Sequence, residues 1–92
     1  MLAPDSPAES LITYPSAFAI KVMGEQVPGF VEAVTAVAAR FDPEFDPNNV
    51  QLRPSKGGRY LGVTVTVTAT SRAQLDDLYR ALSGHAMVKV VL

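Results

Sequence analysis

Apolar and polar positions alternate without a break from Leu61 to Thr70. A period of two residues is typical of a β-strand that buries one face. The pattern therefore predicts a strand whose Val63, Val65 and Val67 lie in a hydrophobic core and whose threonines lie on the opposite face.

A first helix is predicted before this strand. Apolar residues recur at spacings of three and four from Phe30 to Phe41, and the breaker Asp42–Pro43 follows. Pro28 suits the first turn of such a helix. The apolar stripe is expected to face a sheet.

A second helix is predicted directly after the strand. Ser71 is followed three residues later by Gln74, which is a capping-box pattern. Gly84 stands where a helix C-terminus favours a left-handed residue, and His85 is expected to cap that end.

The remaining segments supply further strands and their connections. Alternating patterns predict strands over residues 17–23, 50–53 and 86–92. Turn-forming residues predict a loop over residues 42–49 and a hairpin turn over residues 54–58. The resulting element order is βαββαβ. This order predicts an α+β ferredoxin-like sandwich, in which a four-stranded antiparallel sheet with strand order 4-1-3-2 carries both helices on one face.

This arrangement leaves the other sheet face open. The residues expected there are Ala17, Ala19, Lys21, Met23, Thr64, Thr66, Thr68, Thr70, Met87, Lys89 and Val91. Val88, Val90 and Leu92 are expected to point inward. A surface that combines threonine with alanine, methionine and valine favours contact with a second copy or another protein, although a monomer with a mildly apolar face is an open alternative.

The composition argues against several classes of binding partner, namely nucleic acids, membranes and metals held by cysteine. A net charge of -1 lacks the basic surface expected of a nucleic-acid-binding protein, and no segment has the apolar length of a membrane span. The absence of cysteine excludes thiolate metal sites and fits a cytoplasmic protein. We expect a single domain over residues 14–92 after a flexible tail over residues 1–13, with no metal and no cofactor.

Candidate ligand contacts lie at two places. Gly24 and Glu25 follow the first strand, where a small ligand can approach the backbone or where the glycine simply lets the chain turn. Arg53, Lys56 and Arg59 flank the hairpin, as a small basic patch or as a solvated tip.

Several short motifs together resemble the YbeD-like (UPF0250) family of small bacterial proteins of unknown function. These motifs are Tyr14–Pro15, Lys21–Gly24, Arg53–Ser55, Tyr60 and the final Val88–Leu92. The resemblance implies a ferredoxin-like fold similar to ACT-type regulatory domains, and a lipoate-linked regulatory role that rests on association. One departure is that Gly57 and Gly58 occupy places where the family has lysine and then glycine, so that Lys56 stands one position early.

The predicted site combines these motifs with the candidate contacts. Its residues are Lys21, Met23, Gly24, Glu25, Arg53, Ser55 and Tyr60. Lys21, in the middle of a strand on the open face, either serves an acidic ligand or extends its ammonium into water.

The predicted function is a non-catalytic regulatory or adaptor domain. It would bind a partner protein or a small metabolite through the open sheet face or the loop after the first strand. An enzyme of unrecognised type is the alternative, although no set of nucleophile, base and orienting group is evident in the sequence. An RNA-binding module is a weaker alternative, because Tyr60 alone among the aromatic residues lies at the margin of the open face.

Overall fold

A computed structural model describes residues 13–92 of the chain. The elements follow one another as β1 (Ser16–Glu25), α2 (Phe30–Phe41), β2 (Val50–Pro54), β3 (Tyr60–Ala69), α3 (Arg72–Ser83) and β4 (Val88–Val91). The tail predicted for residues 1–13 lies, apart from Thr13, outside the described residues.

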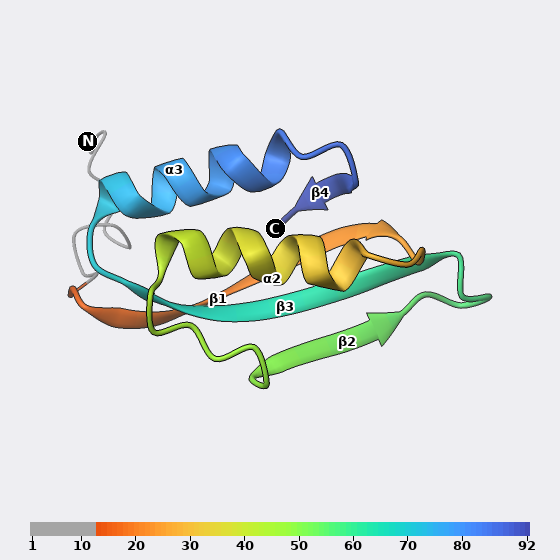
Figure 1. Cartoon of the computed structure of the whole chain (residues 1–92), viewed down its shortest axis with the longest axis horizontal. Helices are drawn as coiled ribbons and strands as arrows, with labels where there is room; N and C mark the ends of the chain where they lie inside the picture. Colours follow the sequence, from red (N-terminus) through yellow and green to blue (C-terminus); the bar gives the residue numbers. More distant parts are fainter. Residues whose placement is uncertain (1–12) are drawn as a thin grey trace, which may run out of the picture.

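The four strands form one antiparallel sheet in the order β2-β3-β1-β4. This confirms the predicted order of 4-1-3-2, read from the other edge. Both helices lie on the same side of the sheet, with α2 across β1 and β3 and α3 beside it (Figure 1). The ferredoxin-like α+β architecture predicted from the element order is therefore present.

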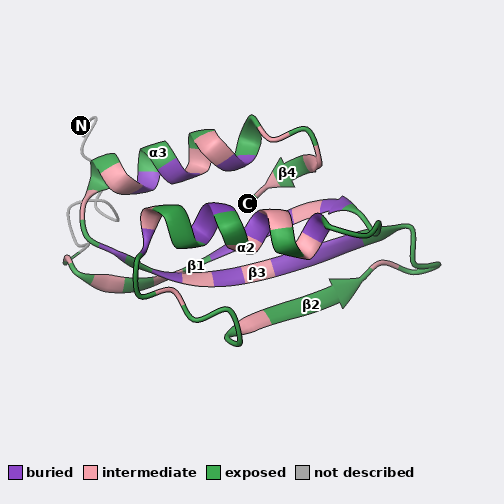
Figure 2. Cartoon of the chain, in the orientation of Figure 1, coloured by how far each residue is buried: buried purple, intermediate pink, exposed green. Residues whose placement is uncertain are grey.

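The core lies between this helical layer and the sheet. Along β3, Val63, Val65 and Val67 are buried, as the alternating pattern predicts. They pack with residues of α2 and α3 in one cluster that includes Phe30 and Leu78. Purple buried segments follow the inner sides of both helices and the central strands in Figure 2.

The predicted orientation of β4 is wrong at its end. Val90 and Leu92, predicted to point inward, are 46% and 65% exposed, whereas Met87 and Val91, predicted on the open face, pack against the core. The cause is an irregularity in the pairing with β1: Val88 pairs with Gly24, whereas Val90 pairs with Met23 and Val91 with Val22. Since one extra residue in a strand reverses which side chains face inward, Val88 and Val91 both point to the core.

Two helix ends also differ from the sequence predictions. Helix α2 begins at Phe30 rather than at Pro28, because Gly29 at its N-terminus has a φ of 90°, a left-handed conformation. Gly84 at the end of α3 has a φ of -85° and is right-handed, not left-handed. The ring Nδ1 of His85 accepts a hydrogen bond from the backbone N–H of Met87, so this histidine shapes the turn into β4.

A polar cluster ties the helix ends to β3. Asp42, 4% exposed, accepts hydrogen bonds from the backbone N–H groups of Glu44 and Thr68 at 3.0 and 2.8 Å. Gln74 donates to the carbonyl of Phe41 and accepts from the backbone N–H of Thr70. Asp42, which ends α2, thus also holds this end of the helix on the sheet through its hydrogen bond with the backbone of Thr68.

Candidate functional site

The open sheet face brings together five of the seven predicted site residues. Side chains of residues paired across antiparallel strands share a face, and Glu25 pairs with Tyr60, Met23 with Gly62, and Gly62 with Arg53. Lys21 lies two residues before Met23 on the same face of β1. The residues on this face are Lys21, Met23, Glu25, Arg53 and Tyr60.

Gly62 lies at the centre of this group. It occupies a polar position in the alternation of β3 but has no side chain, so its neighbours surround a gap. A Cβ atom built on Gly62 would lie 3.3 Å from the Cε of Lys21. The aliphatic stem of Lys21 therefore reaches from β1 across to β3 and covers the backbone of Gly62, which is buried.

Arg53 flanks Gly62 from the opposite side. It lies on edge strand β2 directly across from Gly62, and its backbone carbonyl would lie 3.6 Å from a Cβ at position 62. Tyr60 and Thr64 flank the glycine along β3. We call this group the Gly62 site, which consists of Lys21, Met23, Arg53, Tyr60, Gly62 and Thr64.

The two cations of the Gly62 site lack a carboxylate partner within residues 13–92. The ion pairs in this part of the chain are Arg72–Asp76 and Arg80–Asp77, both on α3. Glu25, the acidic residue on the open face of β1, pairs with Tyr60 one step beyond Gly62 and forms no ion pair with Lys21. The site is therefore locally basic although the whole chain has a net charge of -1.

Ser55 has a structural position in the hairpin between β2 and β3. Its Oγ accepts a hydrogen bond from the backbone N–H of Tyr60, and its own N–H donates to the carbonyl of Tyr60 at 2.8 Å. Gly57 and Gly58 provide the left-handed backbone of this turn, with φ values of 89° and 77°. These contacts fix the backbone of Tyr60, whose ring lies 5.4 Å from the Arg59 guanidinium.

Gly24 lies on the helix side of the sheet, apart from the other predicted site residues. A Cβ atom there would lie 2.4 Å from the Met87 carbonyl oxygen and 2.6 Å from the Phe30 ring. The close approach that this glycine allows is thus made by the protein itself.

A pocket of about 220 Å³ lies at the end of β1. It is lined by Glu25 at the end of β1, Val27 between β1 and α2, Ala86 and Met87 between α3 and β4, and Lys89 of β4. This pocket corresponds to the predicted ligand position in the loop after the first strand. Its β4 side was missed as a site, although the predicted order, with the last strand antiparallel to the first, already places residues 86–89 beside the end of the first strand.

Gly62 was the other residue missed by sequence reasoning. The available signal was that Gly62 stands at a position of β3 where the alternation otherwise has threonine. The sequence does not show that the side chain of Lys21 lies over this glycine. Within residues 13–92, no cluster of three or more histidine, cysteine or acidic residues could hold a metal ion. No helix in the described part of the chain is long and apolar enough to cross a membrane.

Comparison with solved structures defines the class of domain. Protein HP0495 from H. pylori matches with a TM-score of 0.72 and 14% identity over 98% of each chain. The ACT domain from GTP pyrophosphokinase of Chlorobium tepidum matches with a TM-score of 0.64 and 19% identity, over 84% of this chain and 83% of that one. The chain is thus an α+β domain with an ACT-like, ferredoxin-like fold.

Sequence comparison then identifies the family. Residues 9–92 match the family described as "Protein of unknown function (DUF493)". A UPF0250 protein of Leptothrix cholodnii is 68% identical over 89 residues, covering 96% of this chain and 98% of that protein. A UPF0250 protein of Bordetella pertussis is 65% identical over 86 residues, or 94% of each chain. The chain belongs to this family, which confirms the resemblance noted from its motifs.

Proposed function

We propose that this chain is a non-catalytic regulatory or adaptor domain of the cytoplasm, which binds a partner protein or a small metabolite through its open sheet face. The observation that supports this most is the Gly62 site. Four of the predicted contact residues meet there around a glycine, on the sheet face opposite the helices. The stem of Lys21 fills the space above this glycine, so a bound molecule would contact the side chains around Gly62 rather than its backbone.

The chemistry of the face favours binding over catalysis. The polar groups of the Gly62 site are an ammonium, a guanidinium and two hydroxyls. Such groups orient and neutralise a bound molecule, but hydrolysis or group transfer also requires a positioned base beside a nucleophile. The ACT-like fold of the structural neighbours is compatible with a regulatory role, and a link to lipoate metabolism stays a prediction.

The pocket beside Glu25 is a second candidate binding place. Its lining combines one carboxylate and one ammonium, from Glu25 and Lys89, with the apolar side chains of Val27 and Met87. A concave site with few polar groups is typical of small-molecule binding. Lys89 therefore provides a variant that separates the pocket from the open face.

A capture experiment tests the proposed function. The immobilised chain is exposed to a bacterial lysate beside its Lys21→Ala and Lys89→Ala variants, and a thermal-shift screen with metabolites runs in parallel. We expect a protein that the parent and Lys89→Ala retain but Lys21→Ala loses, or a metabolite that raises the melting temperature of the same two chains. A ligand at 100 times its Kd stabilises the native state by about 2.7 kcal/mol.

The pattern of loss locates the binding place. Loss with Lys89→Ala alone would move the function to the pocket. Binding that survives both substitutions, or no binding in either assay, would contradict the proposal.

A further inference from the structure

We propose that the Gly62 site binds the carboxylate or phosphate group of a small metabolite. This inference rests on the proposed function, because it assigns a ligand chemistry to the same sheet face. It is carried by two basic residues, Lys21 and Arg53, whose strands flank Gly62 on the open sheet face, with the Lys21 stem lying over that glycine.

The first step is the position of Lys21. An exposed lysine on a sheet face normally extends into water, where its side chain keeps its conformational freedom. Here the Cε atom comes within 3.3 Å of the place a Cβ on Gly62 would occupy, and the side chain is half-buried. Gly62 thus provides the space in which Lys21 lies across β3, in the direction of β2.

The second step is the neighbour that Lys21 approaches. Arg53 lies on β2 in direct register with Gly62, and adjacent strands are about 4.8 Å apart. The ammonium of Lys21 and the guanidinium of Arg53 therefore belong to adjoining positions on one surface. An anion bound between the two side chains could contact both charges.

The third step is the lack of an internal counterion. Neither cation forms an ion pair within residues 13–92, whereas Arg80 and Arg72 on α3 each have an aspartate within reach. The carboxylate of Glu25 lies beside Tyr60 and forms no ion pair with either cation. The carboxylate of Leu92 is also near, because its oxygen accepts a hydrogen bond from the backbone N–H of Lys21 at 3.3 Å, but it forms no ion pair with either side chain. Both side chains are therefore available to an external anion.

The surrounding groups fit an oxyanion. A guanidinium donates two parallel hydrogen bonds to a carboxylate or a phosphate, and an ammonium adds a charge from another direction. The hydroxyls of Tyr60 and Thr64 flank Gly62 along β3 as further donors. Met23, across from Gly62, offers an apolar surface for the carbon skeleton of the ligand.

A titration of the isotope-labelled full chain tests the inference. Backbone amide shifts are followed by NMR during additions of inorganic phosphate, and separately of succinate, with sodium chloride at matched ionic strength as the reference. We expect saturable shifts at Gly62, Thr64 and Arg53 with phosphate or succinate, and no saturable shift with chloride. The arm that saturates at lower concentration identifies the phosphate or the carboxylate as the preferred group.

Matched variants connect the binding to the two cations. Lys21→Gln keeps most of the stem that covers Gly62 but removes the charge, and Arg53→Gln does the same on β2. Each should weaken binding by about tenfold or more, since charged hydrogen bonds are the strong ones. Arg40→Gln, which removes an exposed guanidinium from α2 on the helical side of the sheet, should leave the dissociation constant unchanged.

The outcomes separate this inference from the proposed function. Absence of saturable shifts with both anions, or equal binding by Lys21→Gln, overturns the anion site. If the lysate experiment nevertheless shows Lys21-dependent capture, the proposed function stands and the face binds through another chemistry. If both fail, the proposed function fails as well.

Discussion

Gly24 and Gly62, two glycines in adjacent strands, have different surroundings. Gly24 on β1 pairs with Leu61, the neighbour of Gly62, but Gly24 faces the helices whereas Gly62 lies on the open face. The Phe30 ring and the Met87 carbonyl fill the space beside Gly24, and the Lys21 side chain fills the space beside Gly62. The sequence shows both residues as breaks in a pattern, but what fills the space beside a glycine depends on residues distant along the chain.

The contacts of Gly24 lead to a prediction for Gly24→Ala. The added methyl group would meet a carbonyl oxygen at 2.4 Å and the Phe30 ring at 2.6 Å, so the backbone or the ring must move. Overpacking of this kind costs about 1–3 kcal/mol. For a domain of this size, each kcal/mol lowers the melting temperature by about 4–8 °C, which a thermal denaturation curve would detect.

The control for Gly24→Ala is Ala19→Val. It adds bulk to the same strand on the open face, where residue 19 is exposed, and should change stability by no more than about 0.5 kcal/mol. Equal melting temperatures for Gly24→Ala and the parent would contradict the packing described for Phe30.

At the scale of elements, β4 shows where pattern reading fails. A regular strand has a period of two, which predicts that Val88, Val90 and Leu92 point inward. The pairing shift between Met23 and Gly24 breaks that period, and no residue type in the sequence marks it. Register errors of one residue exchange the two faces of a strand, so the element was predicted correctly while its orientation was not.

Two neighbouring substitutions test this orientation. Val91 pairs with the fully buried Val22 and packs against the core, so Val91→Lys should destabilise the domain by about 2 kcal/mol or more. Val90→Lys places the same charge on the exposed side and should be nearly neutral. Chemical denaturation of both variants compares them directly, and the reverse order of stabilities would restore the regular strand.

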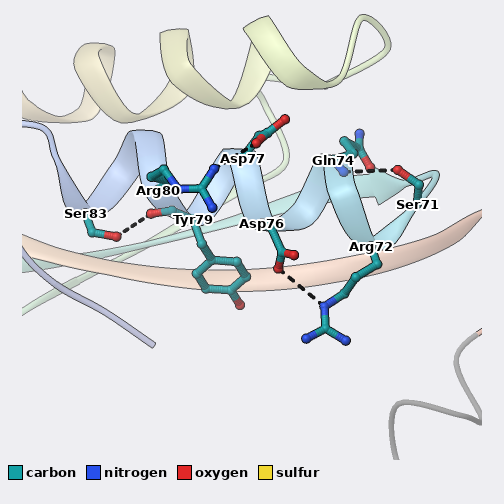
Figure 3. A network of polar contacts seen from close by, with 8 residues as sticks. All are labelled: Ser71, Arg72, Gln74, Asp76, Asp77, Tyr79, Arg80 and Ser83. Carbon is teal, nitrogen blue, oxygen red and sulfur yellow. Dashed lines mark hydrogen bonds and ion pairs between the residues drawn. The ribbon is translucent and has the colours of Figure 1, made fainter. Parts of the chain in front are cut away.

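The side chain of Gln74 connects the start of α3 to the rest of the fold. Figure 3 shows Gln74 beside Ser71 at one end of the helix and the Arg72–Asp76 ion pair on its surface. The side chain of Gln74 also bonds the carbonyls of Phe41 and Thr68, at 2.8 and 3.1 Å, so one amide joins α3 to α2 and β3. The bond from the backbone N–H of Gln74 to the Ser71 hydroxyl agrees with the predicted capping box, but the Gln74 side chain accepts from the N–H of Thr70 instead of Ser71. Its contact with α2 is not evident from the sequence.

Gln74→Ala should therefore cost more than a surface substitution on the same helix. It leaves the Phe41 carbonyl, whose bond to Gln74 is part-buried, without its partner, and such a loss costs about 1–3 kcal/mol. Asp77→Ala removes an exposed ion pair with Arg80 and should cost less than about 1 kcal/mol. If urea denaturation gave the two variants the same midpoint, Gln74 would be no more than an ordinary surface residue.

At the scale of the whole molecule, the fold was predictable because strong local patterns occurred in an order with one compact solution. The threonine and valine alternation of β3 and the two apolar helical stripes were sufficient for the strand order and the open face. The candidate site was harder to predict from the sequence than the fold. Sequence motifs suggested Lys21, Arg53 and Tyr60 separately, but their meeting at Gly62 depends on the register of three strands, and register is a property of the folded sheet.

The same sheet organisation predicts how stability is distributed. β3 pairs along its length with β1 and is also paired with β2, and its inward valines are at most 1% exposed. Every residue of β2 is exposed or half-buried, and this strand has a neighbour on one side only. Local opening should therefore release β2 without disrupting the core, whereas opening of β3 requires the loss of most of the fold.

Hydrogen exchange by NMR measures this difference. Amides of β3 that bond to β1 should exchange at least about ten times more slowly than those donated by β2, a factor equivalent to about 1.4 kcal/mol in opening free energy. The Val90→Lys variant should leave the rates in β3 nearly unchanged, because its substitution lies outside the core. Equal protection of β2 and β3 would instead mean that the edge strand opens only with the whole domain. Arg53 on β2 would then be held as firmly as Gly62 on β3.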